Sequence, residues 1–243
     1  MGEPVHRELI GRLAAARRPV VFSGAGLSAE SGIPTFRGRV DHALWSRHDP
    51  QQLASIEGFE RAPELVLEWY DWRRGLVVEA TPNSAHVALA RWQQATLITQ
   101  NVDDLQERAG ADPDRVLHLH GSIMQDRCHA TCGWSMPADP DSPRGWHPCP
   151  ECGARTRPGV VWFGEGLPEE TWALATRACS NADLILVIGT SGVVQPAASL
   201  VELAAASGAY VVNVNPEATP LDSMADTCLH SAAGEVLPEL LPD

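Results

Sequence analysis

The sequence predicts an α/β fold whose centre is a doubly wound parallel sheet. The first observation is a series of short, uninterrupted apolar runs rich in β-branched residues. Such runs are typical of strands that are covered on both faces by helices. The second observation is that these runs alternate with amphipathic helical stretches. A regular alternation of strands and helices makes the doubly wound open sheet the most common outcome.

Six runs have the character of buried strands. They are residues 19–22, 95–99, 116–119, 160–163, 184–188 and 210–214. Helices are expected at residues 5–17, 63–78, 84–93, 169–179 and 196–206. Pro63 suits the first turn of its helix, because backbone N–H groups in a first turn have no acceptor within the helix. Asn83 is a good N-cap for the helix that follows it.

Two segments break this alternation. Residues 39–80 are helical and aromatic without a clear strand, and residues 126–158 combine a cysteine cluster with six prolines. Both are expected to be insertions that form a second, smaller lobe. The sequence therefore predicts a large domain of residues 1–38, 81–125 and 158–243, and a small domain of residues 39–80 and 126–157.

The charge balance limits the partners that the protein can have. The chain carries 18 basic and 31 acidic residues, a net charge of −13, and all 18 basic residues are arginines. This balance argues against nucleic acid and anionic membranes, which require a basic surface. The longest aliphatic run is too short to span a bilayer, and the N-terminal residues do not resemble a secretory signal. We expect a cytoplasmic protein.

Four of the six cysteines gather in one short stretch. The spacing is Cys128-x3-Cys132-x16-Cys149-x2-Cys152. In a reducing compartment such clustering indicates a metal site rather than disulfides. Four thiolates leave no open position on zinc, so the ion would be structural. The first pair is one residue longer than usual, and His129 remains an alternative to Cys128.

A glycine-rich turn, Gly24-Ala25-Gly26-Leu27-Ser28-Ala29, follows the first predicted strand. This pattern lets a backbone approach the pyrophosphate of a dinucleotide, although a plain turn is compatible with it as well. An ordinary dehydrogenase would place an acidic residue at the end of a second strand about 20 residues later. No such strand is present here, so a dinucleotide would need contacts from elsewhere in the chain.

From Gly24 to Arg37 the sequence resembles the sirtuins, the NAD-dependent protein lysine deacylases. Further matching motifs follow in the family's order. They are Thr99–Asp103, His120-Gly121, the cysteine cluster, Arg157–Glu165, Gly189–Ser191 and Asn213–Glu217. The resemblance implies a Rossmann-like NAD-binding domain and a small domain made of a zinc ribbon and a helical insertion. It also implies one structural zinc ion.

The resemblance assigns catalytic and cofactor roles to numbered residues. His120 matches the base that activates a ribose hydroxyl, and Asn101 and Asp103 match contacts to the nicotinamide half of NAD. His118 would share a face with His120 on a strand, but His120 precedes the motif's glycine. The remaining implied NAD contacts are Gly24, Ala25, Gly26, Ser28, Ala29, Glu30, Thr35, Phe36, Arg37, Gln100, Val102, Gly189, Thr190, Ser191, Asn215, Pro216, Glu217 and Ala233.

Tyr70 and Arg73 stand three residues apart, on one face of a predicted helix. A phenol and a forked guanidinium suit a carboxylate. An isolated pair of this kind is usually a surface feature, but here it resembles the Tyr-x-x-Arg signature of class III sirtuins, which remove succinyl, malonyl and glutaryl groups. Ala54 matches a small residue that leaves room for the longer acyl chain. The implied substrate-facing residues are Val161, Trp162, Phe163, Gly164 and Glu165.

Two positions depart from the family pattern. Gln106 replaces a usual histidine, and Gly159 stands where relatives often carry histidine. The expected partners are acylated lysine side chains of proteins, bound by a monomer through backbone strand pairing. Mono-ADP-ribosyl transfer and a non-enzymatic NAD-sensing role are the alternatives. The presence of His120, Asn101 and Asp103 argues against the second of these.

Overall fold

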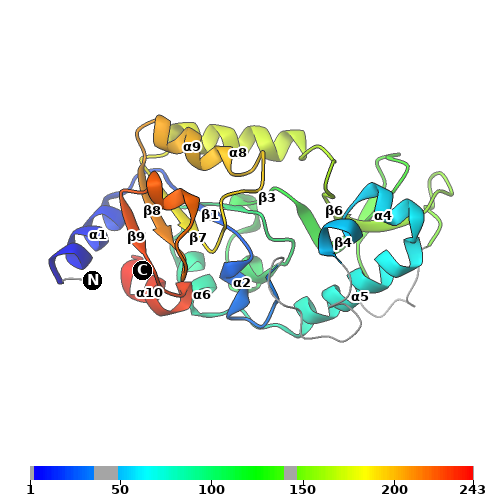
Figure 1. The fold of residues 1–243 in the computed structure, drawn as a ribbon, viewed down its shortest axis with the longest axis horizontal. Helices are drawn as coiled ribbons and strands as arrows, with labels where there is room; N and C mark the ends of the chain where they lie inside the picture. Colours follow the sequence, from blue (N-terminus) through cyan, green and yellow to red (C-terminus); the bar gives the residue numbers. More distant parts are fainter. Residues whose placement is uncertain (1–2, 36–48, 140–146, 243) are drawn as a thin grey trace.

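A computed structural model describes residues 3–35, 49–139 and 147–242 of the chain. It contains a six-stranded sheet in the order β3-β2-β1-β7-β8-β9 and a three-stranded sheet in the order β5-β4-β6. Figure 1 shows the larger sheet beside both termini and the smaller one at the opposite end of an elongated molecule. The two sheets are the centres of the two lobes that the sequence predicts.

The strands of the large sheet are β1 Pro19–Ser23, β2 Thr96–Thr99, β3 Val116–His118, β7 Leu184–Ile188, β8 Tyr210–Val214 and β9 Thr227–Leu229. All neighbouring pairs in this sheet are parallel. The doubly wound parallel sheet is therefore confirmed. Five of the six predicted strands lie in it, and β9 was not predicted.

The helices are α1 Glu3–Ala15, α2 Gly26–Ala29, α3 Pro50–Leu53, α4 Ile56–Arg61, α5 Pro63–Glu79, α6 Ser84–Arg91, α7 Leu105–Arg108, α8 Glu169–Asn181, α9 Ser199–Ala206 and α10 Ala233–Leu240. The predicted cap of α6 is present, because the Asn83 side chain accepts bonds from the N–H groups of Ala85 and His86. Helix α5 begins at Pro63, as the sequence predicts.

Helices cover both faces of the large sheet. Strand residues alternate between the two faces, so Val21 belongs to the core under α1, α6 and α10, whereas Val20 and Phe22 belong to the core under α8 and α9. Figure 1 shows α8 and α9 along one side of the sheet and α6 and α10 on the other. This two-sided burial explains why the strands are mostly apolar on both faces.

The small lobe corrects one predicted strand. Its sheet consists of β4 Gly121–Cys128, β5 Ser135–Pro137 and β6 Thr156–Val160, paired antiparallel. The run 160–163 was expected to form a strand, but the strand ends at Val160 and belongs to this smaller sheet. Val160 and Trp162 are apolar because they pack into the core beneath α5. The apolar residues of the run 160–163 are therefore buried without continuing the strand. The expected domain boundaries at 125/126 and 157/158 fall inside β4 and β6.

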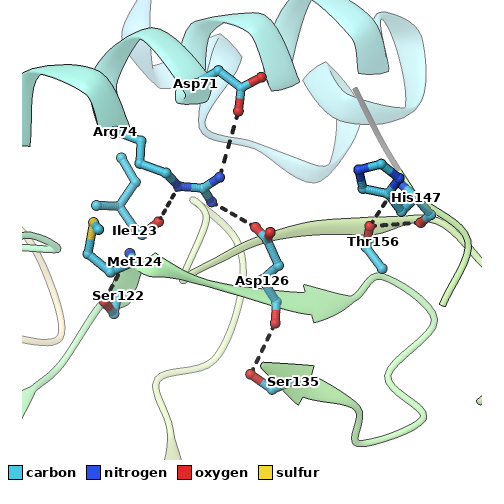
Figure 2. A network of polar contacts seen from close by, with 9 residues as sticks. All are labelled: Asp71, Arg74, Ser122, Ile123, Met124, Asp126, Ser135, His147 and Thr156. Carbon is cyan, nitrogen blue, oxygen red and sulfur yellow. Dashed lines mark hydrogen bonds and ion pairs between the residues drawn. The ribbon is translucent and has the colours of Figure 1, made fainter. Parts of the chain in front are cut away.

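A buried arginine joins helix α5 to the small sheet. Pairing between β4 and β6 is irregular between Ser122 and Asp126, and the carbonyl of Ile123 lies in this stretch. Arg74 Nε donates to that carbonyl at 2.8 Å, and Arg74 Nη2 contacts Asp126 Oδ1 at 2.7 Å. Asp71 Oδ1 lies 3.7 Å from Arg74 Nη1 (Figure 2). One guanidinium thus satisfies a strand carbonyl and two carboxylates.

We expect Arg74→Met to destabilise the protein. The variant keeps an apolar stem but leaves the Ile123 carbonyl and Asp126 without their cation, which predicts a loss of about 2–3 kcal/mol in the free energy of unfolding. Urea unfolding measures it. Arg91, an exposed residue of α6, is the matched control. Arg91→Met should cost less than about 0.5 kcal/mol, and equal losses in the two variants would contradict the structural role of Arg74.

Candidate active site

The glycine turn after β1 packs directly on the turn after β7. Gly24 N donates to Ile188 O at 2.9 Å, and Gly26 N donates to Gly189 O at 2.8 Å. A Cβ at Gly26 would lie 2.6 Å from Gly189 Cα, and one at Gly24 would lie 2.8 Å from Thr190 Cβ. Both glycines are therefore required by their close packing against Gly189 and Thr190. The same contact brings the ends of β1 and β7 to one edge of the sheet.

Three predicted residues form a buried hydrogen-bonded cluster beside this turn. Ser28 Oγ donates to Asp103 Oδ2 at 2.9 Å, and Asn101 Nδ2 donates to Ser28 Oγ at 3.0 Å. Leu105 N donates to the other carboxylate oxygen of Asp103. Burial raises the pKa of Asp103, although these hydrogen bonds oppose the shift. The structure thus brings Ser28 from α2 together with Asn101 and Asp103 from the end of β2.

His120 is held as a neutral imidazole by its surroundings. Its Nδ1 lies 2.9 Å from the carbonyl oxygen of Gln100. Because a carbonyl only accepts, Nδ1 carries the proton of the neutral ring and Nε2 keeps a lone pair. Burial lowers the pKa of His120, and the bond to Gln100 opposes this only in part. The arrangement suits a group that accepts a proton at Nε2.

His118 has the opposite character. Its Nε2 lies 2.7 Å from Glu107 Oε1, and its Nδ1 lies 3.2 Å from Asn101 O. Burial lowers the pKa of His118, but the hydrogen bond and charge of Glu107 outweigh it, so the net shift is upward. Strand β3 ends at His118, and His120 lies in the turn that follows. The strand geometry that would place both rings on one face therefore does not extend to His120.

Further predicted cofactor residues connect the ends of β2, β7 and β8. Gln100 Nε2 donates to Thr190 Oγ1 at 2.9 Å, and Asn215 Nδ2 donates to Thr190 O at 3.0 Å. Pro216 and Glu217 follow Asn215 as exposed residues. The carboxyl ends of four adjacent strands, β2, β1, β7 and β8, thus form one polar edge. Such an edge is where open α/β sheets bind ligands.

The remaining predicted cofactor residues lie around this edge. Glu30 Oε2 accepts a bond from Gly234 N at 2.8 Å, which places Glu30 beside Ala233 at the start of α10. Ala25 and Ala29 lie in the glycine turn and α2, Val102 follows Asn101, and Ser191 follows Thr190. Thr35 is the last residue described before the gap at 36–48. Phe36 and Arg37 lie outside the described residues.

Tyr70 and Arg73 lie on α5, in the small lobe. Tyr70 is buried, and its Oη accepts a hydrogen bond from Trp162 Nε1 at 2.9 Å. The Arg73 guanidinium lies 5.0 Å from the ring centre of Trp69. Burial lowers the pKa of Arg73, while the charges of Tyr70 and Asp103 raise it.

The predicted substrate-facing segment, residues 161–165, is bonded to His120 and to Ala54. Val161 N donates to His120 O at 2.8 Å. Phe163 N donates to Ala54 O at 2.9 Å, which ties the small residue Ala54 to the same segment. Phe163 is 41% exposed, whereas Trp162 is 1% exposed. Gly164 has a φ of +88°, a conformation that favours glycine at this turn. The segment is thus joined through its backbone to His120 and to Ala54.

Glu165 anchors this segment from inside the small lobe. Its Oε2 accepts from Trp162 N and from Arg127 Nη2, both at 2.8 Å. Its Oε1 pairs with the buried Arg157. Sequence reasoning did not assign roles to Arg127, Arg157 or Glu107. In the sequence each of them is a charged residue near a motif, and no pattern indicates that Glu165 pairs with Arg127 and Arg157 or that Glu107 pairs with His118.

The four clustered cysteines come together in space. Their sulfur atoms all lie within 4.8 Å of one another, with Cys128–Cys152 and Cys132–Cys149 separations of 3.5 Å. Zinc–sulfur bonds of about 2.3 Å in a tetrahedron give sulfur–sulfur distances of about 3.8 Å, so the thiols fit a zinc ion. The His129 ring packs instead against Phe59, with ring centres 4.9 Å apart. Cys128 is therefore the better fourth ligand.

The two departures from the family pattern have simple local accounts. Gln106 is buried, and its Nε2 donates to Ser23 Oγ at 3.2 Å, at the end of β1. At Gly159 a Cβ would lie 3.0 Å from Gln125 Cβ, so β4 packs tightly over this position of β6.

In the described part of the chain, no helix is long and apolar enough to cross a membrane.

Comparison with known proteins places this site in a family. The Sir2 family signature matches residues 24–196. An "NAD-dependent protein deacylase 1" of Pseudomonas aeruginosa is 50% identical over 247 residues, covering 97% of each chain. A solved Sir2 homolog–NAD complex superposes with a TM-score of 0.90 at 46% identity, covering 96% of this chain and 91% of that one. A solved complex of Sir2 with a p53 peptide and NAD+ superposes with a TM-score of 0.82 at 32% identity, covering 95% of each chain.

These matches account for the glycine turn, the buried Ser28–Asn101–Asp103 cluster, the neutral His120 and the cysteine cluster within one known architecture. The agreement spans almost the entire chain rather than one motif. The protein is therefore a member of the Sir2 family, an NAD-dependent protein deacylase.

Proposed function

We propose that this deacylase removes succinyl and malonyl groups from lysines of proteins, with weaker activity on acetyl groups, and releases nicotinamide and 2′-O-acyl-ADP-ribose. The observation that carries the proposal is the pairing of Tyr70 with Arg73 on α5. Tyr70 is hydrogen-bonded to Trp162, whose neighbour Val161 donates its N–H to His120 O, and the Arg73 guanidinium lies over the ring of Trp69. A phenol and a cation thus lie together on one helix of the small lobe.

The chemistry of the acyl group supports this choice. A succinyl or malonyl chain ends in a carboxylate, which a phenol and a guanidinium together bind well. An acetyl group has no such end and gains nothing from either side chain. Ala54, 5% exposed and bonded through its carbonyl to Phe163, supplies a small side chain where a longer acyl group needs space.

The catalytic roles follow from the geometry of the large-lobe edge. NAD, when bound, supplies the ADP-ribose that accepts the acyl group. We assign proton acceptance to His120 Nε2, since Nδ1 is bonded to Gln100 O. Asn101 and Asp103 are oriented by Ser28 to hold the nicotinamide half, and Thr190, Asn215 and Glu217 belong to the adenosine side. Mono-ADP-ribosyl transfer would use the same edge but would leave label from NAD on the acceptor protein.

The zinc assignment is also part of the proposal. We infer that Cys128, Cys132, Cys149 and Cys152 hold one structural zinc ion as four thiolates. The ion stabilises the β5–β4–β6 lobe and leaves no coordination position for substrate.

Arg73→Met should lower kcat/KM for a succinyl-lysine peptide by about 100-fold, because a charged partner of the carboxylate is lost. The fall for the matching acetyl-lysine peptide should be far smaller. Product formation is followed by mass spectrometry of the peptide. The control is Arg61→Met, at an exposed arginine of α4. Equal losses on both peptides for Arg73→Met would refute the carboxylate receptor.

The acid limb of the kcat/KM profile should have its midpoint below the ordinary histidine value of about 6.5. Burial lowers the pKa of His120, and a protonated Nε2 cannot accept a proton, so activity is lost as the pH falls through this pKa. His118→Gln serves as a control, because the midpoint of the acid limb should stay below 6.5 when His118 is replaced. A midpoint above 6.5 in both proteins would contradict the assignment of a neutral, buried base.

Metal analysis should find one zinc per chain, and Cys149→Ser should release it. Loss of a thiolate removes folding free energy that the metal supplies to the small lobe, so thermal unfolding should shift to a lower temperature. Cys179→Ser is the matched control, because this buried thiol of α8 lies in the large lobe, away from the cluster. Full zinc content in Cys149→Ser would contradict the four-thiolate site.

A further inference from the structure

The hydrogen bond between Trp162 and Tyr70 has a fixed direction. An indole Nε1–H can only donate, so at 2.9 Å the phenol oxygen of Tyr70 must be the acceptor. A phenol has a single proton, and this bond does not use it. The proton of Tyr70 therefore remains available for a second partner. Trp162 in this way determines that Tyr70 acts as a donor toward whatever binds next to it.

The indole that imposes this direction is held firmly. The Arg157 guanidinium lies 3.9 Å from the centre of the Trp162 ring, and the Phe59 ring centre lies 5.1 Å away. Arg157 is itself anchored, because it pairs with Glu165 and donates to Val160 O at 3.0 Å. Glu165 also accepts from the backbone N–H of Trp162. With 1% exposure, the indole has little freedom to turn away from Tyr70.

The surroundings keep Tyr70 in its neutral, proton-bearing form. Burial raises the pKa of Tyr70 far above neutrality, although Arg73 and Trp162 oppose this shift. Tyr70 packs edge-on against Trp69, with ring centres 4.7 Å apart, and Arg73 stacks on the same Trp69 ring. Trp69 thus holds the phenol and the guanidinium side by side. The hydroxyl donor of Tyr70 beside the guanidinium of Arg73 is complementary to an anionic oxygen.

We propose that Trp162 is a specificity-determining, positioning residue: its indole N–H occupies the acceptor side of the Tyr70 hydroxyl, so that Tyr70 donates to the carboxylate of an acidic acyl group. The inference rests on the proposed preference for acidic acyl groups. It assigns Trp162 a role that acts through Tyr70. An acetyl group has no distal acceptor for this proton, so the effect of Trp162 should be seen mainly on acidic acyl chains.

The test compares kcat/KM for two peptides that differ only in a succinyl or acetyl group on lysine. Trp162→Phe removes the N–H but keeps a ring for Arg157 and Phe59. The ratio of desuccinylation to deacetylation should fall about 5-fold, the order of one hydrogen bond, and should fall through KM for the succinyl peptide. Trp172→Phe, on α8 in the other lobe, is the matched control and should leave the ratio unchanged.

A double-mutant cycle shows whether Trp162 acts through Tyr70. Tyr70→Phe alone should lower the same ratio, and adding Trp162→Phe should lower it no further. A further fall in the double variant would overturn the inference, because Trp162 would then act independently. An unchanged ratio in Trp162→Phe would also overturn it.

Two further measurements keep the result interpretable. If Trp162→Phe fails to fold, incorporation of β-(3-benzothienyl)alanine at position 162 replaces the N–H by sulfur at nearly constant shape, with the same fall expected. Arg73→Met separates this inference from the proposed function. If that variant loses both activities equally, the proposed function fails and the inference fails with it. If it is selective while the change at 162 is not, only the inference fails.

Discussion

The polar edge of the large sheet depends on one close backbone contact, between the glycine turn after β1 and the turn after β7. Side chains at Gly24 or Gly26 would collide with Gly189 and Thr190, so the two turns can meet only because these glycines lack a Cβ. Their contact places α2, and with it Ser28, beside the end of β2. Asn101 and Asp103 acquire their orientation from Ser28, and Thr190 is positioned for Gln100 and Asn215. The polar edge follows from a steric condition on backbone atoms.

Much of the large lobe could be predicted because its strands are buried on both faces. Runs such as 184–188 are apolar at every position for that reason, and they were identified correctly. The small lobe was harder to predict. β4, with Ser122, Gln125, Asp126 and Arg127, faces polar partners and lacks the strand signature, while the run 160–163 is apolar through packing beneath α5. An apolar run predicts that its residues are buried. It also predicts strand pairing when the strand lies in a sheet that is covered on both faces.

Motifs predict the candidate catalytic and acyl-group residues, but they do not predict the partners of these residues. The sequence places His118 and His120 two residues apart and offers no physical difference between them. In the structure Glu107 of α7 is hydrogen-bonded to His118, while His120 Nδ1 is bonded to the carbonyl of Gln100. Their pKa values therefore move in opposite directions. Likewise, Glu165 is the last residue of the segment 161–165 and pairs with Arg157 of β6, a contact that no motif in the sequence predicts.

The exclusive use of arginine gains a physical meaning in this context. Several of these arginines satisfy backbone carbonyls at helix ends: Arg115 donates to Leu89, Ala90, Trp92 and Ala95 around the end of α6, and Arg108 donates to Val77 and Ala80 at the end of α5. A guanidinium reaches several acceptors in one plane, whereas an ammonium is a compact charge that cannot span them. The same planarity lets Arg157 stack on Trp162 while it pairs with Glu165. Replacing such residues by lysine would keep the charge and lose the planar geometry of these contacts.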